Sequence, residues 1–126
     1  MLNARTDTYL AATDGDPFDE TVERAIRYVE AGADCVFVPG VADEDTIRRL
    51  VAAIPAPLNV VAGLASTTAA PTLFSLGVKR VSLGGSLARA SLSLLERAGQ
   101  ELRESGTLGF LDGALSYAET QARFSP

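Results

Sequence analysis

Short apolar runs recur along this chain at a constant spacing. Cys35, Leu58 and Val81 each lie in a short run rich in β-forming residues, and 23 residues separate each from the next. The stretches between these runs carry apolar residues at helical spacing. Strands that alternate with helices in this way predict βα units and a parallel sheet, so we expect the α/β fold class.

Four βα units are expected in all. The four strands are expected within residues 1–9 and at Cys35–Val38, Leu58–Val61 and Lys79–Leu83. Helices are expected at Glu20–Ala31, from Asp43 or Asp45 to Ile54, from Thr67 or Thr68 to Gly77, and at Leu87–Leu102. A further short helix is expected after Thr107. Four units are half of a TIM-type (β/α)₈ barrel, which usually has about 250 residues. We therefore predict a single domain over residues 1–126, a (β/α)₄ half-barrel with a long C-terminal helix. A small open four-stranded α/β sheet is the alternative.

The first nine residues place polar side chains on a strand. Asn3 and Arg5 share one face of that strand and Leu2 and Ala4 share the other, with Asp7 just beyond its end. A strand face made of Asn and Arg is unusual in a core and typical of an anion site. Because the strand begins at Met1 with nothing before it to pair with, we expect the preceding part of the fold to be missing from this sequence.

Composition narrows the classes of function. A net charge of −5 without a Lys/Arg cluster argues against nucleic-acid binding, and no apolar run approaches the roughly 20 residues of a membrane helix. The single cysteine, Cys35, cannot form an internal disulfide, which favours a cytoplasmic location. The absence of histidine excludes a Ser-His-Asp triad, a Cys-His dyad and His-ligated zinc.

Four stretches in the same order and at the same spacing carry a family resemblance: Asn3–Asp7, Ala31–Gly40, Pro57–Gly63 and Leu76–Gly84. With them the chain resembles the C-terminal half of the isocitrate lyase/phosphoenolpyruvate mutase superfamily. The shorter bacterial members, of the carboxyvinyl-carboxyphosphonate phosphorylmutase-like branch, are most similar. The resemblance covers nearly the whole chain and implies that it supplies strands five to eight of a (β/α)₈ barrel.

The resemblance also implies a chemistry. Family members break or make C–C or P–C bonds next to a carboxylate, through an enolate-type intermediate held by Mg²⁺. The acidic residues that hold Mg²⁺ belong to the first half, as does the mobile loop with a catalytic Cys in the lyases, so Mg²⁺ is implied without ligands in this chain. Several lyases carry a Glu where this chain has Pro39, which argues against a close 2-methylisocitrate lyase activity.

Four residues are candidates for binding a small carboxylate or phosphonate. The guanidinium of Arg5 can hold such a group with two hydrogen bonds, and the resemblance places it at the end of strand five as the acid-binding arginine. The alternative is a structural ion pair with Asp7. Asn59 and Asn3 could bind a substrate oxygen or be interior amides, the latter being favoured for Asn3. The turn at Gly84 could bind phosphate through backbone N–H groups or be an ordinary turn.

Other polar groups are expected to be structural. Asp7 is expected to orient Arg5 or cap the following loop, and Cys35 is expected in the core because no nearby base favours its thiolate. By the resemblance the helix Leu87–Leu102 is exchanged between subunits, and the alternative is packing on its own barrel. The remaining acidic residues suit a solvated loop and a helix N-terminus better than a metal site: Asp14, Asp16, Asp19 and Glu20.

Three functions follow from these expectations. The first is a Mg²⁺-dependent lyase or phosphonomutase-like enzyme with Arg5 as its anion clamp, inactive as this chain alone. The second is a non-catalytic half-barrel that acts as a structural or regulatory subunit, in a homo-oligomer or paired with a missing N-terminal half, because open sheet edges and an open inner face require partners. The third is a generic phosphate-binding α/β module that uses the Gly84 turn.

Overall fold

The computed structural model describes residues 1–11, 15–63 and 68–124. Its contacts divide the chain into two compact units, Met1–Ser86 and Leu87–Pro126. The first unit contains the sheet and the second contains most of the helical C-terminal region. Each unit is described by itself below.

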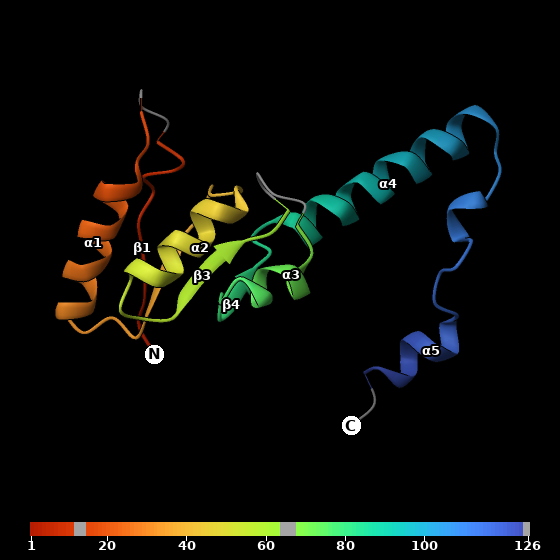
Figure 1. The fold of residues 1–126 in the computed structure, drawn as a ribbon. Coiled ribbons are helices and arrows are strands. Elements are labelled where there is room, and N and C mark those ends of the chain that lie inside the picture. The colour runs from red at the N-terminus through yellow and green to blue at the C-terminus, as the bar shows by residue number, and fades with distance from the viewer. Residues whose placement is uncertain (12–14, 64–67, 125–126) are drawn as a thin grey trace. The chain divides into compact units, whose positions relative to one another are not determined.

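The first unit is built on a parallel four-stranded sheet (Figure 1). Its strands are β1 (Asn3–Arg5), β2 (Cys35–Val38), β3 (Leu58–Val61) and β4 (Arg80–Ser82), and their order in the sheet is their order in the chain. Every neighbouring pair is parallel. The predicted α/β class with a parallel sheet is therefore confirmed, with β1 and β4 as the two edge strands.

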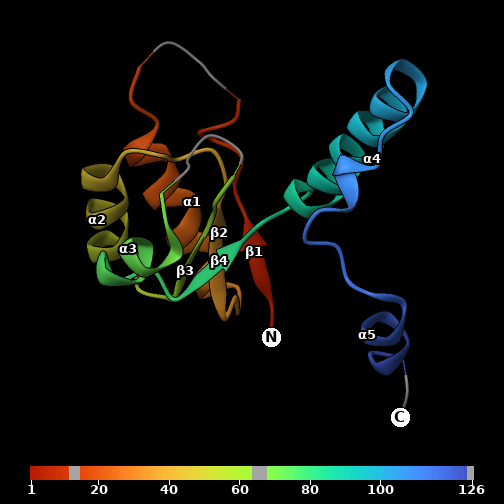
Figure 2. The same cartoon turned by 90° about the vertical axis from the view of Figure 1, so that its right-hand side faces the viewer.

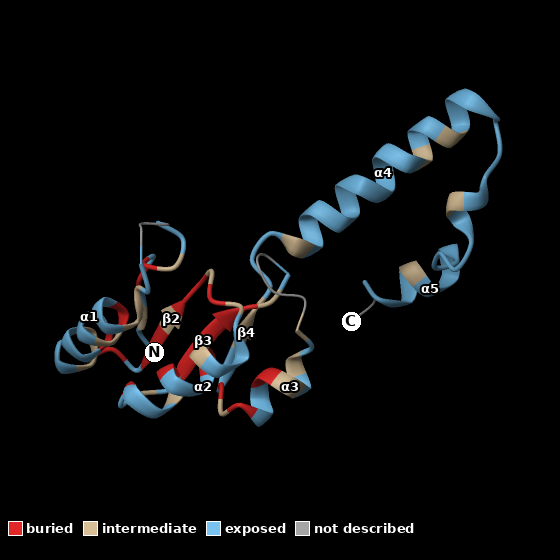
Figure 3. Cartoon of the chain, turned by 45° about the horizontal axis from the view of Figure 1, so that its top comes forward, coloured by how far each residue is buried: buried red, intermediate tan, exposed pale blue. Residues whose placement is uncertain are grey.

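Three helices lie on one face of this sheet (Figure 2). They are α1 (Phe18–Glu30), α2 (Glu44–Ala53) and α3 (Ala70–Ser75). Between helices and sheet lies a core of buried side chains, and Figure 3 shows the buried residues concentrated along β2 and β3. Core members with no exposed surface include Ala25, Val36, Val38, Ile47 and Leu50.

The ends of these helices follow from local chemistry. Asp43 caps α2 by accepting a hydrogen bond from the Thr46 backbone N–H at 2.8 Å, as expected for a helix that begins there. Gly32 follows α1 with a φ of +99°, a conformation that favours glycine. The third helix begins at Ala70 with Pro71 in its first turn, so a start at Thr68 is wrong. The alternative start, Thr67, lies outside the described residues.

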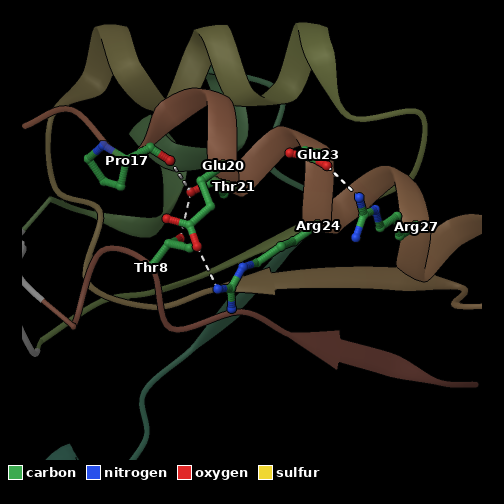
Figure 4. A network of polar contacts seen from close by, with 7 residues as sticks. All are labelled: Thr8, Pro17, Glu20, Thr21, Glu23, Arg24 and Arg27. Carbon is green, nitrogen blue, oxygen red and sulfur yellow. Dashed lines mark hydrogen bonds and ion pairs between the residues drawn. The ribbon is translucent and has the colours of Figure 1, made fainter.

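Hydroxyl groups fasten α1 to the loop that follows β1 (Figure 4). The buried hydroxyls of Thr8 and Thr21 lie 2.5 Å apart, and Thr21 also donates to the Pro17 carbonyl oxygen at 2.7 Å. The side of α1 that faces solvent carries i,i+4 ion pairs, such as Glu20 with Arg24. The loop is thereby held against the helix and positions the residues that follow Arg5.

The second unit consists of helices with little buried surface. The long helix α4 (Ser86–Glu104), predicted from the sequence, is followed by the 3₁₀ turn η1 (Gly109–Leu111) and by α5 (Tyr117–Ala122). No described residue of α4 is buried, and its leucines stand in solvent. The turn after α4 is held by the Glu101 carboxylate, which accepts hydrogen bonds from the backbone N–H groups of Gly109 and Phe110. None of the described helices combines the length and apolarity that a membrane span requires.

Candidate functional site

The sheet of the first unit presents two chemically different faces. Alternation along each strand sends Ala4, Val36 and Leu58 toward the helices. The residues on the opposite side, here called the open face, are Asn3, Arg5, Cys35, Phe37, Asn59, Val61, Arg80 and Ser82. The register aligns four of them in one row across the sheet: Arg5, Phe37, Asn59 and Arg80. In a closed barrel this face lines the interior.

Arg5 stands at the carboxyl end of β1, where (β/α)₈ barrels place their active sites. Its Nε donates to Asp7 Oδ1 at 2.6 Å, and its guanidinium lies 5.7 Å from the centre of the Phe37 ring. Both contacts orient the guanidinium. The side chain is 53% exposed, and its two terminal nitrogens have no hydrogen-bond partner in the part of the chain that the structure describes. Arg5 can therefore present two parallel N–H groups to an anion.

The two asparagines both lie on the open face. Asn59 is fully buried, and its Oδ1 accepts a hydrogen bond from the Ser82 hydroxyl at 3.1 Å. Its Nδ2 and the Oδ1 of Asn3 are buried without a partner among the described residues. A buried polar group without a hydrogen-bond partner is energetically costly, so these two amide groups are available to accept or donate hydrogen bonds. That either amide binds substrate stays a prediction.

Gly84 lies in the turn between β4 and α4. It has a φ of +52° and is exposed, and a methyl group in place of its hydrogen would meet nothing within 4 Å. Gly63, at the end of β3, is more confined, because a Cβ there would lie 2.6 Å from the Ser86 hydroxyl oxygen. Gly84 follows one edge strand and Arg5 ends the other, three strand spacings or about 14 Å away. A single small anion therefore does not span the direct distance between the two strand ends.

The buried thiol of Cys35 also belongs to the open face. Burial raises its pKa, and the nearby charge of Arg80 acts in the opposite direction. A thiol with a raised pKa is a poor nucleophile. This agrees with a core role for Cys35.

Three further residues were not singled out by sequence reasoning. Phe37 and Arg80 were counted as part of strands, and the register, which pairs both with Asn59, places them on the open face. Tyr9, in the loop after β1, is half-buried, and its hydroxyl lacks a partner among the described residues. Burial and the charge of Asp16 raise the pKa of Tyr9 to about 12, so its hydroxyl stays protonated at neutral pH.

The described residues do not form a magnesium site. Mg²⁺ takes oxygen ligands, chiefly carboxylates and water. The open face offers two amides and one strand hydroxyl, and the nearest carboxylate, Asp7, is engaged with Arg5. No cluster of three or more acidic, Cys or His side chains occurs in residues 1–11, 15–63 and 68–124. The donor groups of these residues therefore do not fit a bound Mg²⁺ by themselves.

Comparison with known proteins agrees with this geometry. Residues 1–103 match the phosphoenolpyruvate phosphomutase family. An uncharacterised protein of Mycobacterium tuberculosis (strain H37Rv) is 39% identical over 123 residues, which cover 98% of this chain and 45% of that protein. A protein of Corynebacterium glutamicum named as a probable 2-methylisocitrate lyase 1 is 32% identical over 117 residues, which cover 89% of this chain and 37% of the relative.

Solved structures show the same relationship. A Burkholderia cenocepacia J2315 protein described as a lyase/mutase superposes with a TM-score of 0.89 at 40% identity, over 99% of this chain and 45% of that one. A phosphoenolpyruvate phosphomutase from Streptomyces platensis subsp. rosaceus gives a TM-score of 0.76 at 22% identity, over 98% and 43%. The second likeness concerns the fold alone.

The chain thus spans less than half the length of the relatives it matches. Its four parallel strands and their helices correspond to one half of the TIM-type barrel of those relatives. The family match, the relatives and the barrel geometry agree. This chain belongs to the phosphoenolpyruvate phosphomutase family, within the PEP mutase/isocitrate lyase superfamily.

Proposed function

We propose that this chain supplies the anion-binding half of a lyase or mutase. The enzyme would cleave or rearrange a C–C or P–C bond next to the carboxylate of a small 2-oxo or hydroxy acid. Family membership supports the class of reaction, and the exposed guanidinium of Arg5 at a strand end supports the role of this half. The unpaired Cys35 fits a cytoplasmic location.

The role of Arg5 is to bind and orient the acidic group of the substrate. Asp7 holds the Nε and Phe37 lies beneath the guanidinium, so the two terminal nitrogens are fixed before the substrate arrives. A fork held in this way loses little freedom on binding, which favours both affinity and orientation. The reacting bond is then held at a defined position above the strand ends.

Bond cleavage needs groups that the open face does not supply. An acid or base must lie within hydrogen-bond reach of the reacting atoms. The described face offers Arg5 and Arg80, amides, one hydroxyl and a protonated thiol, which bind but do not readily exchange protons near neutral pH. We propose that the proton-transferring and magnesium-holding groups come from the rest of the barrel, so that the isolated chain binds anions without turnover.

Calorimetric titration with oxalate, a two-carboxylate probe, tests the role of Arg5. We expect Arg5→Ala to weaken oxalate binding about tenfold or more, because a charge-assisted bidentate contact is lost. Arg5→Lys should recover part of the affinity, since it keeps the charge and loses the fork. Arg48→Ala is the matched control: Arg48 is an exposed helix arginine paired with Asp45.

Two results would contradict the proposal. Unchanged oxalate affinity in Arg5→Ala would remove Arg5 from the site and favour the generic phosphate module, which Gly84→Pro should then impair. Turnover of a 2-oxo or hydroxy acid by the purified chain alone would contradict its incompleteness.

A second candidate function is a non-catalytic half-barrel subunit in a homo-oligomer. The edges of β1 and β4 support it, because unpaired strand edges favour association. Sedimentation of the purified chain separates the two candidates. A strictly monomeric chain across the micromolar range would contradict self-assembly.

A further inference from the structure

Arg80 is a charged side chain on the open face that the anion site does not use. Its register partner is Asn59, and Ser82, two residues further along β4, hydrogen-bonds to that same Asn59. Both observations place Arg80 on the open face. Its effect on the pKa of Cys35, another residue of this face, agrees with that position.

The open face carries two arginines, and only one of them has an acidic partner in the described structure. Arg5 has Asp7 as its partner at 2.6 Å, whereas Arg80 makes no ion pair with any residue that the structure describes. None of the eight residues of the open face is acidic. Arg80 is exposed, as the first residue of an edge strand, so water solvates its charge.

Closing the barrel changes the surroundings of Arg80. A further strand paired to the β4 edge brings the open face into the barrel interior, which side chains fill. A guanidinium enclosed there without a counter-charge is strongly unfavourable, and arginine does not relieve this by losing its proton. A carboxylate on the segment that covers the open face would remove this cost.

We propose that the open face docks a complementary βα segment whose inner surface carries an Asp or Glu that pairs with Arg80. The partner is thus defined by its chemistry: parallel strands to extend the β4 edge and a carboxylate on the strand nearest to it. This inference rests on the incompleteness of the chain stated in the proposed function.

The same charges argue against a second copy of this chain as the occupant. A barrel made from two copies would enclose two Arg80 side chains and no additional acid on the open faces. The nearest carboxylate of each copy, Asp7, is already engaged with Arg5. A self-paired barrel therefore doubles the unbalanced charge, whereas an acidic complementary segment removes it.

The test uses this chain with the part of the Mycobacterium tuberculosis relative that it does not match, as the complementary segment. That relative is 39% identical over 98% of this chain and 45% of its own length, so its remaining part is the segment that accompanies a half related to this chain. We expect the two to bind in titration calorimetry and Arg80→Met to weaken binding about tenfold or more. Arg80→Lys should keep most of the affinity. Arg24→Met, which removes an exposed arginine of α1 paired with Glu20, is the control.

A double-mutant cycle identifies the counter-charge. Each Asp and Glu of the complementary segment is changed to Asn or Gln, and one such change should weaken binding to wild type but not further weaken binding of Arg80→Met. The readout is association without substrate, so it is independent of oxalate binding through Arg5. The pairing of Arg80 can therefore be disproved while the role of Arg5 stands, and the role of Arg5 can be disproved while the pairing of Arg80 stands.

Three results would overturn the inference. The first is no association between wild-type chain and complementary segment. The second is association that Arg80→Met leaves unchanged, with no coupled carboxylate. The third is a stable homodimer of this chain that competes with the complementary segment, which would make a second copy the occupant.

Discussion

The two units of this chain differ in how their helices are stabilised. The helices of the first unit bury an apolar stripe against a sheet, and Ile47 and Leu50 of α2 are wholly buried there. The 19-residue helix α4 of the second unit has no buried residue in the described structure, and Leu87 and Leu95 are 69% and 67% exposed. Similar sequence patterns therefore serve two purposes. One completes a core within the chain, and the other leaves apolar surface to be covered from outside.

The largest expected difference between the units is in the response to leucine truncation. Leu50→Ala should lower the free energy of unfolding by about 2–5 kcal/mol, because it leaves a cavity in a close-packed core. Leu95→Ala should change it by less than about 0.5 kcal/mol, because the side chain is largely in water. Urea unfolding followed by circular dichroism measures both. Equal losses would show that α4 is packed within the chain after all.

Glycine substitution gives the next largest difference. Gly77→Ala should cost about 2–4 kcal/mol, from left-handed strain and from a Cβ placed 2.7 Å from Val51 Cγ1. Gly106→Ala, at a φ of +69° with nothing within 4 Å, should cost only the strain, about 1 kcal/mol. The same urea titration compares them. A larger loss at Gly106 than at Gly77 would contradict the packing described for the first unit.

Protonation of a helix-capping carboxylate should change the global stability in the first unit but not in the second. Hydrogen bonds from the Thr46 hydroxyl and N–H lower the pKa of Asp43 below its ordinary 3.8, so its stabilisation is present above that value and is lost as the pH falls through the lowered pKa. Asp43→Asn keeps the cap and should flatten the acid-side loss of stability. Ser116 lowers the pKa of Glu119 in α5 in the same way. Because α5 has no buried residues, Glu119→Gln should leave global acid unfolding unchanged.

The smallest expected effect on stability is that of Arg5→Ala. The Arg5–Asp7 pair is more than half exposed on both sides, so its loss should change the free energy of unfolding by less than about 0.5 kcal/mol. Anion affinity should nevertheless fall about tenfold or more. A strong loss of stability together with unchanged oxalate binding would assign Arg5 a structural role instead.

The strands and their order could be predicted because their signals are local. The apolar runs at Cys35, Leu58 and Val81 and their even spacing fix parallel pairing between chain neighbours, and the structure shows that order. The start of the third helix was misplaced because Thr68 is a good capping residue, while in the structure the extended Ala69 precedes the helix and Pro71 lies in its first turn.

The site was only partly predictable from the sequence. The position of Arg5 on the same strand face as Asn3 was predicted because alternation is a local signal. Its anion-binding role came chiefly from the family resemblance and stays a prediction. Phe37 and Arg80 were missed because their place on the open face depends on register across strands, which no single strand encodes. The burial of Asn59 and its contact with Ser82 depend on side chains 23 residues apart.

The strand order also has a consequence for how the chain folds. Each strand pairs with the one before it, joining residues 32, 22 and 21 positions apart: Asn3 with Cys35, Val36 with Leu58, and Asn59 with Arg80. These separations are short for parallel strands, which need a crossover between them, so the entropy of loop closure stays low for this topology. During synthesis each βα unit can join the growing sheet before the next is made. The strand added last then presents the free edge with which the next strand pairs, and in this sheet that strand is β4.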